Sequence, residues 1–224
     1  GSSVTVSRLA VIAKSFDKPS ETFIRQHTRE LASGRTVIAA RDQQKPGTDF
    51  AALPGFWGFP AKGKAWWAGK ATGLSGLARF LRRQRVDTVL IEYGSLAAQV
   101  VPLIRHLPVS IHVHFHGYDA TRHPRQKGVR DAYAQMFRDV DGVIAPSGFI
   151  ADKVIALGAR PCAVTVCPCG VAIDHFTPSR LRPGRCLAVG RFVEKKAPLV
   201  TLAAFAEARD AKPDLTLDFV GAGP

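Results

Sequence analysis

Three histidines at every second position are the most conspicuous group of chemically active side chains in the sequence. His112, His114 and His116 alternate with Val113 and Phe115. In a β-strand, successive side chains point to opposite faces, so the three imidazoles would share one face and the two apolar side chains the other. Gly117 follows His116 directly, which places His116 at the end of the strand, where the chain turns.

The histidine spacing leaves two interpretations open. A His-x-His pair on a strand can reach one zinc ion, which would suit a metal-dependent hydrolase built on all three histidines. Such a site also needs groups that orient its ligands, and the spacing alone supplies none. In the other interpretation, which we favour, His112 and His114 are half-buried in the sheet with one hydrogen bond each. His116 is then the histidine that takes part in chemistry.

The charge of the chain indicates an anionic partner. Its 224 residues include 31 Lys and Arg against 18 Asp and Glu, a net charge of +13. Nucleic acid, an anionic membrane surface or a phosphorylated small molecule would each suit this excess. Nucleic acid is the least favoured, because the chain lacks RNA-binding aromatic motifs, zinc-finger spacing and a single long basic run. No apolar run approaches the ~18 residues of a transmembrane helix.

The four cysteines, Cys162, Cys167, Cys169 and Cys186, do not form a recognisable motif. Their spacing fits neither a zinc ribbon nor a redox Cys-x-x-Cys pair. We expect free thiols in a reducing cytoplasm, buried on or near strands.

Short runs rich in Val and Ile alternate with stretches of helical periodicity. This alternation predicts an α/β fold, a Rossmann-like parallel sheet with helices on both faces. Strands are expected at residues 8–14, 35–40, 87–94, 110–117, 141–147 and 163–168, and helices near 20–34, 73–85, 95–106, 125–138 and 148–157. Ligands bind such sheets at the carboxyl ends of the strands, which selects residues 14–22, 92–94, 116–119 and Ser147.

The first predicted helix has a clear apolar face. Phe23, Ile24, His27 and Leu31 lie along it, and Ser20 is a plausible N-cap. Gly34 is a plausible C-terminal stop.

A polar stretch with two prolines, residues 177–184, is the expected domain boundary. We expect a first Rossmann-like domain at residues 3–178 and the beginning of a second at 184–224. The second part reads as strand, helix near 196–209, and strand. About 40 residues are too few to hold a separate core, so this part is expected to lean on the first domain or to open an incomplete one.

Six segments resemble, in order, those of retaining glycosyltransferases of family 4. They are KPSETFI, FHGYDA, VIAPSGFIADKVIALG, VTVCPCGVAIDHFTP, LAVGRFVEKKAPL and LDFVGAGP. The resemblance implies the GT-B architecture, in which two Rossmann-like domains face a cleft. Residues 3–178 would be the acceptor-side domain, and residues 184–224 the start of the nucleotide-sugar-binding domain. The segment SETFI resembles the corresponding segment in the branch of the family that builds bacterial exopolysaccharides, such as colanic acid, and related glycans.

The resemblance also implies roles for individual residues. His116 matches the catalytic-site histidine that contacts the transferred sugar. Arg191 and Lys196 match the cations that hold the donor diphosphate, where they would stabilise charge growing on the leaving phosphate. An acceptor-side role is implied for Ser20, Glu21, Thr22, Gly117 and Asp119. The donor would be a nucleotide diphosphate sugar, and the family requires neither a metal nor another cofactor.

The sequence departs from the family at two points. Ala197 stands where the family usually has Gly, a change that we expect only to reduce backbone freedom. The family's Glu-x7-Glu pair would lie beyond Pro224, so we expect this chain by itself to be a truncated, inactive transferase.

These observations predict an enzyme of polysaccharide biosynthesis that moves a hexosyl group, with retention, to a glycan or a polyprenyl-diphosphate-linked acceptor. A basic cluster at residues 62–85, which includes Trp66 and Trp67, favours peripheral contact with the inner face of the cytoplasmic membrane. A second cluster at residues 121–130, just after His116, would suit the phosphate of a lipid-linked acceptor, or simply solvent. The alternatives are the metal-dependent hydrolase and a non-catalytic nucleotide-binding or nucleic-acid-binding module.

Overall fold

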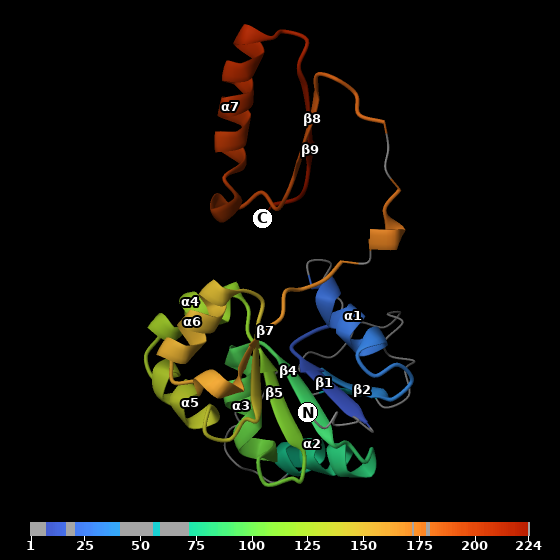
Figure 1. Cartoon of the computed structure of the whole chain (residues 1–224), viewed down its shortest axis with the longest axis vertical. Coiled ribbons are helices and arrows are strands. Elements are labelled where there is room, and N and C mark those ends of the chain that lie inside the picture. The colour runs from blue at the N-terminus through green and yellow to red at the C-terminus, as the bar shows by residue number, and fades with distance from the viewer. Residues whose placement is uncertain are drawn as a thin grey trace. The chain divides into compact units, whose positions relative to one another are not determined.

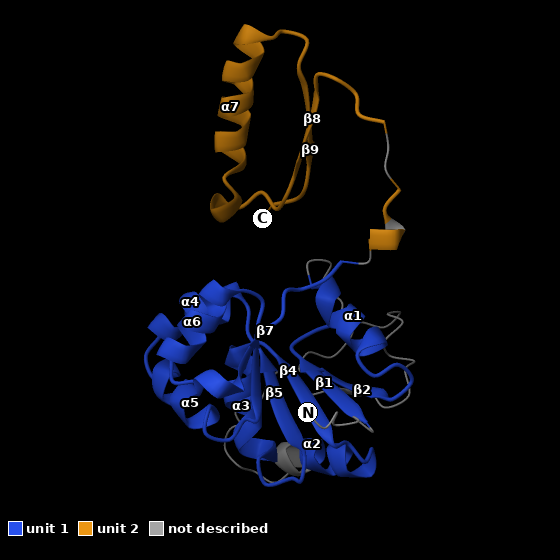
Figure 2. Ribbon diagram, viewed as in Figure 1, with its two compact units in different colours: residues 1–171 blue, residues 172–224 orange. Residues whose placement is uncertain are grey.

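A computed structural model of the chain describes residues 8–16, 21–40, 56–58, 72–171, 173–177 and 180–223 (Figure 1). The chain divides into two compact units, residues 1–171 and 172–224 (Figure 2). The division falls just before the Pro-containing stretch expected as the boundary.

Unit 1 contains a seven-stranded sheet in the order β3-β2-β1-β4-β5-β6-β7. Every pair of neighbouring strands is parallel. The strands are β1 (Leu9–Ala13), β2 (Thr36–Ala40), β3 (Phe56–Gly58), β4 (Thr88–Glu92), β5 (Ser110–His114), β6 (Gly142–Ala145) and β7 (Val164–Val166). The predicted parallel α/β sheet is therefore confirmed.

Helices connect the strands and lie around the sheet (Figure 1). They are α1 (Thr22–Glu30), α2 (Thr72–Arg83), α3 (Gly94–Ile104), α4 (Gly117–Thr121), α5 (Val129–Met136) and α6 (Gly148–Ala156), with short 3-10 turns at His123–Arg125 and Pro161–Ala163. A further 3-10 turn, Ile173–His175, belongs to unit 2. No helix among the described residues has both the length and the apolar character needed to cross a bilayer.

Alternate residues of the strands contribute to two separate apolar clusters. Ala10 and Ile12 of β1 pack in the larger one with side chains of α2, α3 and α5. Val11 and Ala13 belong to the smaller one, together with Ile24 of α1. Helix α1 therefore covers the opposite face of the sheet from α2, α3 and α5.

Two predicted helices differ from the observed ones. Helix α1 ends at Glu30, and its buried face contains Ile24 and Thr28, whereas Leu31, expected on that face, is 57% exposed. The helix expected near 125–138 begins at Val129, because Gly128 adopts a left-handed conformation with φ 77°. Ser20, the predicted N-cap, lies outside the described residues, and Glu21 precedes the first turn of α1.

The expectation of buried cysteines is wrong, since all four are exposed free thiols. Cys162 lies in a 3-10 turn, and Cys167 and Cys169 follow the edge strand β7. Cys186 lies on β8, whose strand is exposed over most of its length.

Unit 2 consists of β8 (Arg185–Val189), a 3-10 turn (Glu194–Lys196), α7 (Pro198–Ala211) and β9 (Thr216–Val220), in which β8 and β9 pair in parallel. None of its described residues is fully buried. Leu187 and Leu199 are 65% and 78% exposed, as expected where so few residues surround a single helix and two strands.

Candidate functional site

The side chain of Glu92, the last residue of β4, is completely buried and surrounded by histidines. Its Oε1 lies 2.6 Å from Nδ1 of His27. Its Oε2 lies 3.1 Å from Nδ1 of His114 and 3.3 Å from Nε2 of His116. One carboxylate is therefore shared by three imidazoles.

The fold explains why these residues meet. Strands β4 and β5 are neighbours, and Glu92 is the register partner of His114, so their side chains share one face of the sheet. His116 follows two residues later and repeats that orientation. Helix α1 covers this same face and brings His27 to the other carboxylate oxygen.

The histidines keep Glu92 ionised. Burial by itself would raise the pKa of this carboxyl group, but hydrogen bonds from His114, His116 and His27 bring its pKa far below the ordinary value. An ionised carboxylate accepts hydrogen bonds only, so each imidazole donates an N–H to it. In a neutral imidazole, this contact places the proton on the nitrogen that faces the carboxylate.

His116 is held between two aromatic rings. Its ring centroid lies 4.5 Å from that of Phe23 and 4.6 Å from that of Tyr93. The side chain remains 14% exposed, whereas that of His114 is 3% exposed. His116 is thus oriented by Glu92 and the two rings, and is more accessible than its neighbour.

Asp119 supports the turn around His116. Its carboxylate accepts hydrogen bonds from the backbone N–H of Gly94 at 2.7 Å and from that of His116 at 2.8 Å. The residue is fully buried, and burial raises its pKa. Asp119 therefore holds the backbone around His116 in place, and its acceptor-side role stays a prediction. Gly117 is exposed at the start of α4.

The residues predicted before α1 lie near this site to different extents. Glu21 is half-buried and accepts a hydrogen bond from the Tyr93 hydroxyl. The pKa of Tyr93 is raised, chiefly by burial and secondly by the negative charge of Glu21. Because Tyr93 packs on His116, Glu21 is connected to the histidine group. Thr22 is exposed.

His112 takes no part in the histidine group. Its Nε2 lies 3.2 Å from Oγ of Ser110, and its ring occupies the space where a side chain at Gly142 would clash. Within the described part of the chain, the sets of side chains that could hold a metal are His114, His116 and Cys169, and His27, Glu92 and His114. Neither contains His112, so the trio required by the hydrolase alternative does not form.

In unit 2, Arg191 and Lys196 line one hollow of about 70 Å³, together with Gly190 and with Pro198 and Thr201 of α7. The Arg191 loop is held by backbone hydrogen bonds from Gly190 to Val220 and from Phe192 to Ala222, each with the first residue donating. A Cβ at Gly221 would collide with the Gly190 carbonyl oxygen. The absence of a side chain at Gly221 thus permits the close approach of the two backbone segments that positions Arg191.

The family model for Glycosyltransferase Family 4 matches residues 20–175, more than half of the chain. The chain belongs to glycosyltransferase family 4. No curated protein sequence matches it.

Three solved structures of glycosyltransferases have a fold similar to that of this chain. The family 4 chain aligns with Anabaena Alr3699/HepE in complex with UDP at a TM-score of 0.74 and 13% identity, covering 97% of this chain and 61% of that one. The outer core galactosyltransferase WaaB aligns at a TM-score of 0.61 and 14% identity, covering 96% of this chain and 68% of that one. Sucrose-phosphate synthase from Thermosynechococcus elongatus aligns at a TM-score of 0.62 and 12% identity, covering 96% of this chain and 70% of that one. The fold is that of GT-B glycosyltransferases, and the chain spans about 61% of the HepE structure.

No individual role was predicted from the sequence for three side chains of this site, Glu92, His27 and Tyr93, although the strand-end rule selected residues 92–94. Two signals were present. Glu92 ends an otherwise apolar strand, and a buried charge needs partners. His27 lies on the predicted apolar face of its helix. Tyr93 has φ 74°, a conformation that costs on the order of 1–3 kcal/mol and tends to occur at functional sites.

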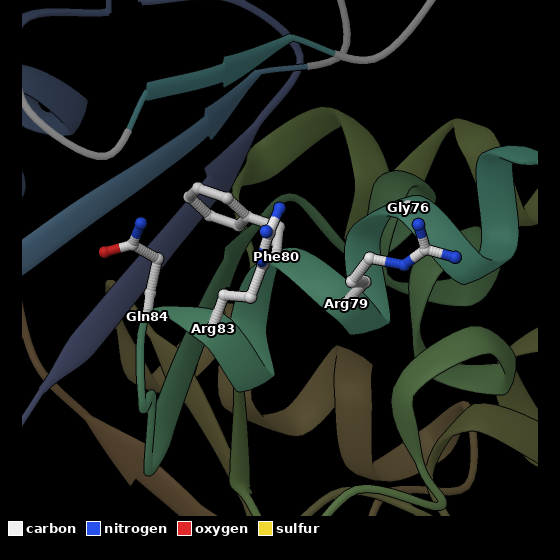
Figure 3. A pocket seen from close by; sticks show the side chains of 5 residues that line it. All are labelled: Gly76, Arg79, Phe80, Arg83 and Gln84. Carbon is white, nitrogen blue, oxygen red and sulfur yellow. The ribbon is translucent and has the colours of Figure 1, made fainter.

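A second surface feature of the family 4 chain lies on α2. Gly76, Arg79, Phe80, Arg83 and Gln84 line a hollow of about 360 Å³, and the side chains of Arg79, Phe80 and Arg83 project from this helix (Figure 3). Arg82 and Arg85 are also exposed. The rest of the predicted membrane-binding cluster, Lys62, Lys64, Trp66, Trp67 and Lys70, lies outside the described residues.

Proposed function

We propose that this family 4 protein transfers a hexosyl group from a nucleotide diphosphate sugar to a glycan or a polyprenyl-diphosphate-linked acceptor, with retention at the anomeric carbon, in polysaccharide biosynthesis. The donor is a substrate, and the transfer needs neither a metal nor another cofactor.

The observation that carries this proposal is the convergence of Arg191 and Lys196 on one hollow beside the first turn of α7. Backbone N–H groups at a helix N-terminus attract anions. Arg can grip two phosphate oxygens, and Lys adds a compact charge. Both side chains are exposed and so accessible to a diphosphate, whose negative charge grows as the glycosidic bond breaks.

The nucleotide is best sought among uridine diphosphates. HepE, whose fold is similar, was solved in complexes with UDP and with UDP-glucose. At 13% identity this likeness supports the class of donor and not the sugar.

The proposed role of His116 is to contact the transferred sugar. Nε2 of His116 donates to Glu92, and the side chain also faces the backbone N–H of Asp119 in a capping box, so the imidazole is held in one orientation for contact with the sugar. Glu92 is then a positioning residue that holds the imidazole in this state.

The arginines of α2 support a further part of the proposal, a peripheral contact with the anionic inner face of the cytoplasmic membrane. Arg79, Arg82 and Arg83 are exposed on one helix, beside the half-buried ring of Phe80. Cations next to an aromatic ring suit the interface of an anionic bilayer.

Isothermal titration calorimetry tests the donor site, with UDP, GDP, ADP and the corresponding nucleotide sugars as ligands. We expect a uridine or other nucleoside diphosphate to bind, and Arg191→Ala or Lys196→Ala to weaken binding at least about 10-fold, since a charged hydrogen bond is worth about 1.5–3 kcal/mol. The matched control is Lys195→Ala, which removes an exposed cation that does not line the hollow. If Lys195→Ala weakens binding as much as Lys196→Ala, or no nucleotide binds, the donor site is refuted.

A further inference from the structure

Three potential metal ligands come together beside Glu92. The ligand atoms of His114, His116 and Cys169 all lie within 4.8 Å of one another. The histidines lie at and just past the end of β5, and Cys169 follows β7. Because β5, β6 and β7 are successive parallel strands of one sheet, their carboxyl ends open at the same edge.

One nitrogen in this group has no hydrogen-bond partner. His114 is 3% exposed, and its Nδ1 donates to Glu92. No described residue makes a hydrogen bond with its Nε2, although that atom is buried. A buried polar atom left in this state costs on the order of 1–3 kcal/mol. With the proton on Nδ1, Nε2 presents a lone pair, which is what a metal ion requires of an imidazole.

The second set of possible ligands lacks this property. In the set formed by His27, Glu92 and His114, the carboxylate and the histidines already bind one another. Cys169, in contrast, is exposed and in no disulfide. Nε2 of His116 binds Glu92, and the His116 side chain also faces the backbone N–H of Asp119 in a capping box, a contact that a metal ion would replace. The set with Cys169 therefore offers Nε2 of His114 and the Cys169 sulfur without breaking the contacts of Glu92.

We propose that His114, His116 and Cys169 form a binding site for a divalent transition metal of the zinc class, with Glu92 behind the two histidines. A thiolate with two imidazoles suits Zn²⁺ and disfavours Mg²⁺ and Ca²⁺. A carboxylate that accepts the other N–H of a metal-bound histidine is the usual support of zinc sites. One thiolate and the Glu92 carboxylate together balance the charge of the ion, and the exposed side of Cys169 leaves its fourth position open to solvent.

This site concerns the same imidazole that the proposed function uses. If His116 contacts the transferred sugar, a bound metal removes its imidazole from that role, so metal binding and sugar transfer exclude each other. The metal is then an inhibitor and not a cofactor. This consequence rests on the proposed function, whereas the site itself does not.

The experiment uses chelator-treated protein in which Cys162, Cys167 and Cys186 are replaced by Ser, so that Cys169 is the remaining thiol. Titration with Zn²⁺ alone should show one equivalent bound. Titration with Co²⁺ should produce a sulfur-to-cobalt charge-transfer absorption. In the otherwise unmodified chain, Cys169→Ser should weaken Zn²⁺ binding at least about 10-fold and Glu92→Gln about 10- to 100-fold.

Cys167→Ser is the matched control, because Cys167 is an equally exposed thiol two residues away that belongs to neither set. Equal Zn²⁺ affinity for the Cys167 and Cys169 variants, or no cobalt–sulfur absorption, would overturn the site. Zn²⁺ should also slow sugar transfer by a full-length version of the protein, and Cys169→Ser should relieve this inhibition. Transfer that is insensitive to Zn²⁺ while Zn²⁺ binds would refute the competition and leave the metal site standing.

Discussion

Nδ1 of His27 lies 2.6 Å from Oε1 of Glu92, although 65 residues separate them along the chain. This short contact joins helix α1 to the end of β4 and leaves the second carboxylate oxygen to His114 and His116. Helix packing on this face of the sheet and the orientation of His116 are therefore linked through one carboxylate.

Replacing Glu92 by Gln should destabilise unit 1 by about 3 kcal/mol, in the range found when one member of a buried ionic group is removed. The amide cannot accept as many N–H groups as the carboxylate, so at least one imidazole loses its partner. Urea unfolding followed by circular dichroism measures the change. Glu30→Gln, at an exposed position of α1, is the matched control and should change stability by less than about 0.5 kcal/mol.

The same carboxylate predicts a pH dependence. Its pKa in the folded protein lies below the ordinary value, so the stabilisation is fully present above the unfolded-state pKa of about 4.3 and is lost as the pH falls towards the folded-state pKa. Below pH about 4.3, the unfolding midpoint of the unmodified protein should fall more steeply than that of Glu92→Gln. Parallel curves for the two proteins would contradict this assignment.

In a full-length version of the protein, His116→Ala should lower sugar transfer at least about 100-fold, on the scale of a lost acid–base or transition-state contact, while the melting temperature changes little. Release of nucleoside diphosphate from the donor sugar measures the rate. His112→Ala is the comparison, since His112 lies on the same strand and face but contacts Ser110 instead of Glu92. A stability loss in the His116 variant with unchanged turnover would make His116 structural.

Ala197 is more than a small change from the glycine usual in the family, because it adopts φ 47° before the first turn of α7. This left-handed conformation costs about 1–2 kcal/mol for a residue with a Cβ. Ala197→Gly should therefore raise the unfolding free energy of unit 2 by up to about 1 kcal/mol, after the greater freedom of Gly in the unfolded chain is counted. Ala204→Gly, within α7, should lower it by about 1 kcal/mol.

Removing three cations from α2 tests the membrane contact. Arg79→Gln, Arg82→Gln and Arg83→Gln combined should reduce flotation with anionic liposomes at least about 10-fold, since each basic residue near such a surface is worth about 1 kcal/mol. Binding to neutral liposomes should be weak in both proteins. Replacing Arg182, Lys195 and Lys212, three exposed cations of unit 2, removes the same charge. Equal losses in the two triple variants would indicate a general charge effect.

Much of the fold could be predicted because it depends on neighbouring residues. Short runs rich in Val and Ile identified β1, β2, β4, β5, β6 and β7. The alternation of His112, Val113, His114 and Phe115 correctly placed the apolar side chains on one face. The rule that ligands bind at the carboxyl ends of parallel strands also selected the stretch that contains Glu92 and Tyr93. Arg191 and Lys196 were selected by resemblance, and they line a common hollow.

The tertiary structure alone determined which of these side chains meet. Placing β4 beside β5 and packing α1 on the same face brings Glu92 to His27 and His114, and excludes His112. The approach of Cys169 to the histidines depends on the order of β5, β6 and β7. Such contacts join residues far apart in the chain, and local periodicity specifies the face on which a side chain lies but not the neighbour that it meets across that face.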